Sequence, residues 1–492
     1  MMEFRQAKWD EKLLFEYKGK EMGNSEIDLP EGVRRVKLPF PNLSELEVLR
    51  HFTRLTEMTY GIDVGPVPLG SCTMKYNPRI AAKILQSDKI RNMHPELLKV
   101  GEGRGILKMM YDLQEWLKDA TGMDACSLQP PAGASGELSG VLMIKSYHID
   151  NGENWRDEMI VPDSAHGSNP ASSSMGGFRV IRIQTDDRGN IDLEALKAVS
   201  SNRTAGLMLT NPNTLGLFEE RILEIAEVVH SYGGLLYYDG ANLNGILGIS
   251  RPGDMGFDII HLNLHKTFSA PHGGGGPGAG VVCAKGKLAS YLPGYIVEKA
   301  GGEYILKTPE KSIGSVLSTI GNLPGMVYAY VFLLAYGEDI WKVAVHSTLN
   351  TNYFLSLLRD LKGVTLPFGT DRFRKHETVI SLKHLTEETG ITAEDAAKFL
   401  LEKGLHAPTI YFPLIVEEAM MFEFTETESK EVIEIYAEAL KELIEASYRE
   451  PKTLKGLPTA TSSRRLDLVR ANHPQTMKPS IVYGVRGEGK EV

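Results

Sequence analysis

The chain contains few cysteines and no long apolar run. Three of its 492 residues are cysteines, and the spacing of Cys72, Cys126 and Cys283 matches no zinc site. A small, odd number of cysteines is typical of a reducing compartment, so we expect no disulfide framework. No segment approaches the roughly 18 apolar residues of a membrane span, and the N-terminus lacks the apolar core of a signal peptide. These absences predict a cytoplasmic protein with neither a membrane segment nor a metal site.

An excess of basic residues is also missing. The 54 Lys and Arg residues are outnumbered by 63 Asp and Glu, which gives a formal net charge of −9. Binding to nucleic acid depends on clustered Lys and Arg, so this balance argues against a nucleic-acid partner. The chain does have 42% hydrophobic residues, enough for a large buried core.

Strand-length apolar segments alternate with helical patterns in the middle of the chain. This alternation is typical of crossover connections and a mostly parallel sheet with both faces covered. We therefore predict a large α/β domain over residues 96–340. Its expected strands are 125–128, 159–161, 180–183, 206–209, 235–238, 259–262 and 280–283.

The flanking regions have other patterns. Residues 1–95 are predicted to form an arm with short helices near 43–56 and 78–89, and residues 451–492 an extended tail. A smaller α+β domain is expected over 341–450, entered by a helical stretch at 327–353. Within it we expect a strand at 378–382 and helices at 393–403 and 432–446. Thr425 and Glu428 have the spacing of a capping box for the last of these helices.

Lys266 is the residue from which the functional interpretation starts. It follows the apolar segment 259–264 and precedes the glycine run 273–276. Chemistry in parallel α/β sheets lies at the carboxyl ends of strands. A lysine there is poorly solvated, which favours the neutral amine that attacks a carbonyl, such as the aldehyde of pyridoxal phosphate (PLP). Taken alone, the same residue also fits a surface lysine in a loop.

Asp239 ends another apolar strand, 27 residues before the lysine. PLP chemistry needs a protonated pyridine nitrogen, and a carboxylate beside that nitrogen keeps it protonated. Asp239 is the candidate for this role. The alternative is an aspartate that caps the next turn.

Three further loops follow predicted strands. The small residues of 129–137, with Gly133, Ala134 and Ser135, fit a phosphate site at a helix N-terminus, although any tight strand–helix turn looks similar. His166 could stack on the pyridine ring, or be incidental to a helix cap. Thr210 could bond the 3-oxygen of the cofactor and His265 the phosphate, or each could satisfy a local turn. These candidates extend the PLP hypothesis without proving it.

Two more segments are harder to assign. The glycine run 273–276 allows a close approach to a cofactor, but also fits a flexible surface loop. It does not open a βαβ unit, so it is not a nucleotide-binding loop. The arm segment 68–75 is dense in small polar side chains and could enter an active site, with a turn as the default interpretation.

Together these motifs resemble one family, the P-protein of glycine cleavage. The resemblance spans nearly the whole chain and is carried by residues 65–75, 121–125, 129–137, 163–170, 238–242, 263–268, 273–276, 312–314, 404–409 and 425–430. The length matches the lysine-bearing subunit of the split form of this enzyme. Ser135 departs from the family pattern, in which a bulkier residue is expected.

The resemblance implies a fold, a reaction and partners. It implies the type I, aspartate-aminotransferase-like PLP fold, with Lys266 holding PLP, Asp239 and His166 as further catalytic residues, and Ala241 among the cofactor contacts. It implies decarboxylation of glycine and transfer of the aminomethyl group to the lipoyl arm of H-protein. The implied partner is a homologous subunit 1, with two copies of each chain. The alternative is another type I PLP enzyme, an amino-acid decarboxylase or a desulfurase.

Overall fold

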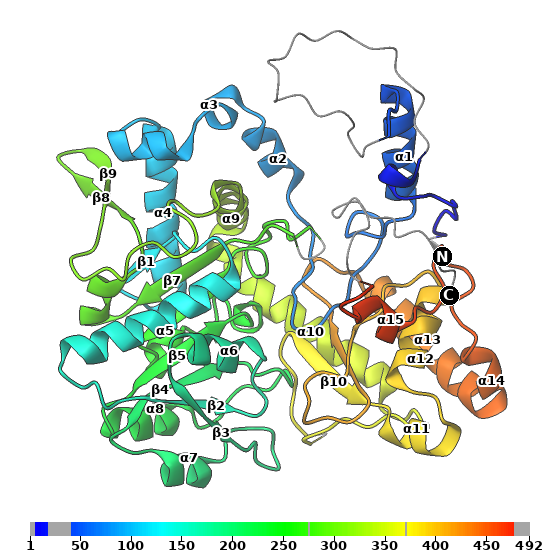
Figure 1. The fold of residues 1–492 in the computed structure, drawn as a ribbon. Coiled ribbons are helices and arrows are strands. Elements are labelled where there is room, and N and C mark those ends of the chain that lie inside the picture. Colours follow the sequence, from blue (N-terminus) through cyan, green and yellow to red (C-terminus); the bar gives the residue numbers. More distant parts are fainter. Residues whose placement is uncertain (1–4, 18–40, 274–275, 370, 477–492) are drawn as a thin grey trace.

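The computed structural model describes residues 5–17, 41–273, 276–369 and 371–476. Parts of the predicted arm (1–4 and 18–40), two glycines of the 273–276 run and the last 16 residues of the predicted tail lie outside these ranges. A large α/β domain and a smaller domain lie side by side, and the arm extends over both (Figure 1). No helix in the described ranges is long and apolar enough to cross a bilayer.

A seven-stranded sheet forms the centre of the large domain. Its strand order is β1-β7-β6-β5-β4-β2-β3, and only β7 runs antiparallel to its neighbours. Every strand predicted for this region is present, so the mostly parallel α/β fold is confirmed. The strands are β1 (Ala125–Ser127), β2 (Glu158–Pro162), β3 (Arg179–Ile183), β4 (Thr204–Thr210), β5 (Leu235–Gly240), β6 (Ile259–Asn263) and β7 (Gly280–Ala284).

Helices cover both faces of this sheet. Neighbouring residues of one strand point to opposite cores, as Tyr237 and Tyr238 of β5 do, because side chains alternate along a strand. This explains why the central strands are continuous apolar segments rather than alternating ones. The helices are α4 (Arg104–Thr121), α5 (Gly133–Asp150), α6 (Ser168–Met175), α7 (Leu193–Val199), α8 (Ile222–Ser231) and α9 (Leu323–Tyr336).

The small domain packs helices on a three-stranded antiparallel sheet, in the order β10-β12-β11. Three aromatic rings meet in its core: Phe354 of α10, Phe422 of β12 and Phe424 just beyond β12. Its elements are α10 (Trp341–Leu358), β10 (Glu377–Ser381), α11 (Lys383–Thr389), α12 (Ala393–Glu402), β11 (Thr409–Ile410), β12 (Ala419–Glu423) and α13 (Lys430–Arg449), followed by α14 (Pro451–Leu454) and α15 (Leu468–Asn472).

The arm touches both domains. Its helices are α1 (Glu45–Glu57), α2 (Arg79–Leu85) and α3 (Asp88–Arg91). Helix α2 packs against α9 of the large domain. Between α1 and α2 the chain runs along the small-domain sheet, where Leu69 forms a β-bridge with Phe422. The segment between the two helices therefore passes where the two domains meet (Figure 1).

The structure corrects three predictions about helices and strands. The helical stretch 327–353 is two helices, α9 and α10, because Gly337 takes a positive φ of 52° between them. Helix α13 is capped by Ser429, whose side chain accepts the Val432 N–H, rather than by Thr425 and Glu428. A hairpin of β8 (Ile296–Ala300) and β9 (Glu303–Lys307) was not predicted.

The expectation of no disulfide is wrong. Cys126 and Cys283 are bonded to each other and lie opposite one another on the antiparallel pair β1 and β7. The number of cysteines does not reveal which of them are close in the fold. Cys126 and Cys283 are 157 positions apart in the sequence and meet only because β1 pairs with β7. Cys72 has a free thiol.

Candidate active site

A cavity of about 360 Å³ opens at the carboxyl ends of β4, β5 and β6. The predicted site residues meet there, with the side chain of Ser135 as the exception. Those that line it are Gly133, Ala134, His166, Thr210, Asp239, Ala241, His265 and Lys266, together with Ser71 and Cys72 of the arm. Residues far apart in the sequence thus converge because parallel strands end at one edge of the sheet.

Lys266 lies three residues beyond the end of β6 and is partly buried. Its Nζ donates a hydrogen bond of 2.7 Å to the backbone carbonyl of Ser71. The arm segment 68–75 therefore enters the active site, one of the two possibilities left open by its sequence. The amine of Lys266 is thus held beside the cavity by the neutral carbonyl of Ser71 and not by a carboxylate.

Asp239 lies at the floor of the cavity and is almost completely buried. Its Oδ2 accepts a hydrogen bond from Asn169 Nδ2 at 2.8 Å, and its Oδ1 accepts the N–H of Ala241 at 3.0 Å. Burial alone would raise its pKa, but nearby His261 and these donors outweigh burial, so the pKa is lowered. Asp239 is thus kept ionised, as a partner for a protonated pyridine nitrogen must be.

Glu137 is a second buried carboxyl group beside Asp239. The same Nδ2 of Asn169 that binds Asp239 also donates to Glu137 Oε1, at 3.0 Å. Burial, and next the charge of Asp239, raise the pKa of Glu137 to about 8. Of two adjacent acids, one is ionised and the other is neutral, which avoids two unpaired negative charges in the same cavity.

The N-terminus of α5 is the candidate phosphate site. The first backbone N–H groups of a helix have no partner within the helix and attract anions. A Cβ on Gly133 would lie 2.1 Å from Asn263 Oδ1, so only glycine fits there. The Ser135 hydroxyl does not face the cavity but donates to the Ala132 carbonyl, and it accepts the Ala132 N–H. Any contact of Ser135 with phosphate therefore runs through its backbone N–H, the kind of contact expected of a helix N-terminus.

Two histidines flank the cavity, and burial lowers the pKa of both. Burial, followed by the nearby His272 and Lys266, lowers the pKa of His265 to about 3, so this ring is neutral. Its Nδ1 lies 3.1 Å from the backbone N of Ala279 and 3.2 Å from the carbonyl oxygen of the same residue. His166 is exposed, and its Nδ1 hydrogen-bonds to Ser168 Oγ at 2.7 Å. His166 therefore lies on the open side of the cavity, where a ring could cover a cofactor.

Several lining residues were not predicted. They include Glu137, His261 and Asn263, and Asn169 lies behind them as a hydrogen-bond donor to two acids. Glu137, Asn169 and Asn263 lie inside segments that carry the family resemblance. His261 and Asn263 belong to strand β6, whose burial hid them among apolar neighbours. The signal that was available is their polarity, because a buried polar side chain in a strand needs a partner.

The residues of the cavity fit PLP. Thr210 Oγ1 and Asn263 Oδ1 are buried and have no hydrogen-bond partner within the described chain, so both are available to a bound molecule. The amine of Lys266, the ionised Asp239 and the helix N-terminus supply the three contacts that an aldehyde, a pyridine nitrogen and a phosphate require.

Comparison with solved structures supports the class. The chain is similar to the inhibitor-bound glycine decarboxylase (P-protein) of the glycine cleavage system, with a TM-score of 0.68, 21% identity and coverage of 85% of this chain and 91% of that one. It is also similar to a NifS-like protein, with a TM-score of 0.59, 16% identity and coverage of 77% and 99%. At these identities the likeness establishes the fold, which is that of the type I PLP-dependent enzymes.

Sequence relatives define the family. The family described as "Glycine cleavage system P-protein" matches residues 26–303, and "Glycine dehydrogenase, C-terminal domain" matches 343–453. A protein of Sulfurisphaera tokodaii is 54% identical over 99% of both chains, and one of Staphylothermus marinus is 52% identical over 97% of both. Both are named "Probable glycine dehydrogenase (decarboxylating) subunit 2". This chain belongs to the P-protein family of the glycine cleavage system.

Proposed function

We propose that this chain is the lysine-bearing subunit of a glycine dehydrogenase (decarboxylating). It decarboxylates glycine and transfers the aminomethyl group to the lipoyl arm of H-protein. The observation that carries the proposal is the meeting of Lys266, Asp239 and the α5 N-terminus in one cavity of a chain about half identical to proteins of that name. The cofactor is pyridoxal phosphate.

The cofactor supplies an electron-accepting ring for the electrons of the breaking C–C bond. The chain controls the charge at that ring through Asp239, which its two hydrogen-bond donors keep ionised. A carboxylate in this state holds a proton on the pyridine nitrogen. The Thr210 hydroxyl is free to bond the 3-oxygen.

The open side of the cavity receives the substrates. Lys266 projects there with its amine on the Ser71 carbonyl, and His166 lies beside it with an exposed ring. Within the described part of the chain, no arginine lines the cavity, so these lining residues offer no guanidinium to the glycine carboxylate.

A partner subunit is implied because the relatives are named subunit 2. We propose that it is the homologous subunit 1, with two copies of each chain, and that lipoylated H-protein docks on this assembly. A cytoplasmic location stays a prediction.

A desulfurase is the alternative, since the fold is shared with a NifS-like protein. Desulfurases need a nucleophilic thiolate. Cys72 lines the cavity, but burial raises the pKa of its thiol despite the nearby lysine, so the thiol stays protonated. This observation favours decarboxylation.

The test is exchange of labelled bicarbonate into glycine by the assembled enzyme. We expect exchange that needs both subunits and lipoylated H-protein, and that falls by more than about 10³-fold in Lys266→Ala. Borohydride reduction should attach the cofactor to Lys266. Attachment to a different lysine, or release of sulfur from cysteine without glycine exchange, would refute the proposal.

A further inference from the structure

The arm segment 68–75, here called the arm loop, is fixed to the small domain by buried glutamates. Ser71 N donates to Glu377 Oε2 at 2.8 Å, and Thr73 Oγ1 donates to Glu423 Oε1 at 2.7 Å. Thr409 Oγ1 in turn donates to the Gly70 carbonyl at 2.7 Å. The loop thus lies against the small-domain sheet, held by one β-bridge at Leu69 and by small-domain side chains that satisfy its polar groups.

The opposite side of the arm loop faces the catalytic lysine. Ser71 uses both of its backbone groups, because its N–H binds Glu377 and its carbonyl accepts the amine of Lys266. It does so with a φ of 62°, a left-handed conformation that is costly for a residue other than glycine. One residue therefore connects a small-domain carboxylate to the lysine of the large domain.

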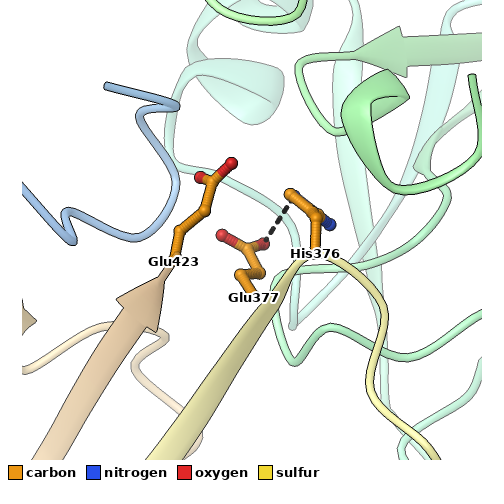
Figure 2. A group of neighbouring side chains, drawn as sticks. All are labelled: His376, Glu377 and Glu423. Carbon is orange, nitrogen blue, oxygen red and sulfur yellow. Dashed lines mark ion pairs between the residues drawn. The ribbon is translucent and has the colours of Figure 1, made fainter. Parts of the chain in front are cut away.

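Glu377 and Glu423 lie beside His376, and their carboxyl groups point into the same buried space (Figure 2). The ligand atoms of the three side chains lie within 4.8 Å of one another, as in a metal site. However, both oxygens of Glu377 already accept hydrogen bonds, one from Ser71 N and one from Asn242 Nδ2 at 2.9 Å. Within the described chain, His376 makes no hydrogen bond and lies 3.7 Å from Glu377 Oε1, the pair marked in Figure 2. Only His376 and one oxygen of Glu423 then have no hydrogen bond, fewer than the three or four ligands that a protein usually supplies to a bound metal.

We propose that Glu377 and Glu423 are positioning residues, which hold the arm loop so that the Ser71 carbonyl orients the amine of Lys266 toward the cofactor. Glu377 has the larger part, because it binds the backbone of Ser71 itself, and Glu423 supports the loop two residues further on. Contact between the small domain and the arm is thereby coupled to the placement of the reactive amine. The inference rests on the proposed function in one respect only, namely that the carbonyl attacked by Lys266 is the aldehyde of PLP.

The chain offers a matched control for Glu377. Glu219 is equally buried, and its oxygens also accept one backbone N–H, from Ile191, and one asparagine Nδ2, from Asn190, both at 2.8 Å. Burial raises the pKa of each of the two glutamates to about 7. Glu219 does not line the cavity and does not touch the arm loop. Glu377→Gln and Glu219→Gln therefore make the same chemical change at two places.

The main measurement is the acetylation rate of Lys266 in the full-length, cofactor-free chain, followed by mass spectrometry, with the rate of PLP capture in parallel. In Glu377→Gln we expect acetylation to rise and PLP capture to slow by about tenfold each, the change expected for loss of one hydrogen bond, because the amide cannot accept from both Ser71 N and Asn242 Nδ2. In Glu219→Gln both rates should stay within about twofold of the wild type. Equal behaviour of the two variants would overturn the proposal.

Two further variants keep the test decisive if Glu377→Gln does not fold. Thr73→Val removes the hydroxyl that Glu423 accepts, and we expect a weaker change in the same direction. Glu423→Gln keeps an oxygen for Thr73 and should behave as wild type, because the other oxygen of Glu423 has no partner to lose.

Metal analysis and the glycine assay complete the design. A stoichiometric divalent cation in the purified chain, lost in Glu423→Gln, would assign the cluster to a metal and overturn the proposal. Acetylation requires neither glycine nor H-protein, so failure of glycine exchange with an intact difference in acetylation would reject the proposed function alone.

Discussion

Asp239 and Glu423 are both buried carboxyl groups near Lys266, and the structure holds them in opposite protonation states. Burial raises the pKa of each, but Asp239 faces His261 and two hydrogen-bond donors, so that its pKa falls. Glu423 has one hydroxyl donor and faces Glu377, so that its pKa is raised well above the ordinary value. The partners of a buried acid, rather than its burial, decide its charge. Around one lysine, the large domain thus supplies a negative charge through Asp239, and the small domain supplies a protonated acid through Glu423.

Asp239→Asn is the variant with the largest expected effect, because it removes the negative charge on which the comparison of Asp239 with Glu423 depends. The amide has the same shape but cannot hold a proton on the pyridine nitrogen, so we expect glycine exchange to fall by about 10²–10⁴-fold. The cofactor should still attach to Lys266, which absorbance and borohydride trapping would check. An activity within tenfold of the wild type would mean that another group holds the pyridine proton.

Removal of the disulfide between β1 and β7 should affect the stability of the protein and leave its activity unchanged, so it is the reference for the variants of the active site. Cys126→Ala with Cys283→Ala removes the bond between β1 and β7. We expect a loss of about 2–4 kcal/mol in the free energy of unfolding, measured by denaturant titration, with glycine exchange unchanged. Impaired exchange at a temperature where the variant is folded would show that this edge also shapes the cavity.

Thr210→Val tests a hydroxyl in the same cavity as Asp239. The hydroxyl has no partner in the described chain, so its loss should cost little stability. If it bonds the 3-oxygen of the cofactor, loss of that bond should weaken PLP binding by about tenfold. Equilibrium dialysis of the cofactor and the position of its absorbance band are the measurements, with Thr214→Val, whose hydroxyl binds the Ser164 carbonyl, as the comparison.

Glu137→Gln is the variant with the smallest expected change in activity, and it tests whether the acid next to Asp239 is uncharged. Glu137 shares the Asn169 amide with Asp239 but has a pKa raised to about 8, so it is already neutral at pH 7. We therefore expect activity within about threefold of the wild type, against the large loss in Asp239→Asn.

The same variant should change the pH dependence of stability. A carboxyl group whose folded-state pKa is raised stabilises the protein fully below its unfolded pKa, here about 4.5, and this contribution is lost as pH rises toward about 8. The thermal unfolding temperature of the cofactor-free chain should thus fall between pH 5 and pH 8, and it should fall less steeply in Glu137→Gln than in the wild type. An identical slope would show that Glu137 is ionised in the folded state.

The fold was largely predictable because strand and helix patterns depend on local periodicity. The strands of the large sheet could be located from apolar segments such as 206–209 and 235–238, since both faces of a parallel sheet are buried. The β8–β9 hairpin was missed because its side chains alternate in burial and give no apolar run. The disulfide was missed because the pairing of β1 with β7 is a tertiary contact.

Site residues that belong to a local sequence motif were predictable. Site residues that act through hydrogen bonds to distant parts of the chain were not. Lys266 and His166 follow strands, and Asp239 and Thr210 lie at the carboxyl ends of strands. That position, together with their side-chain chemistry, made them candidates. Nothing in the sequence indicated that Asn169 bridges two acids, or that Glu377 binds the backbone of Ser71. Such contacts join residues tens to hundreds of positions apart.

The sequence by itself determined the α/β architecture, the strand-end lysine and aspartate, and the membership of a family. Only the tertiary structure decided which acids are charged, where the arm loop goes and what holds the amine of Lys266. The physical reason is that periodicity and motifs are local properties of the chain. The protonation state and orientation of a buried group, by contrast, are set by donors and charges that folding brings within a few ångströms.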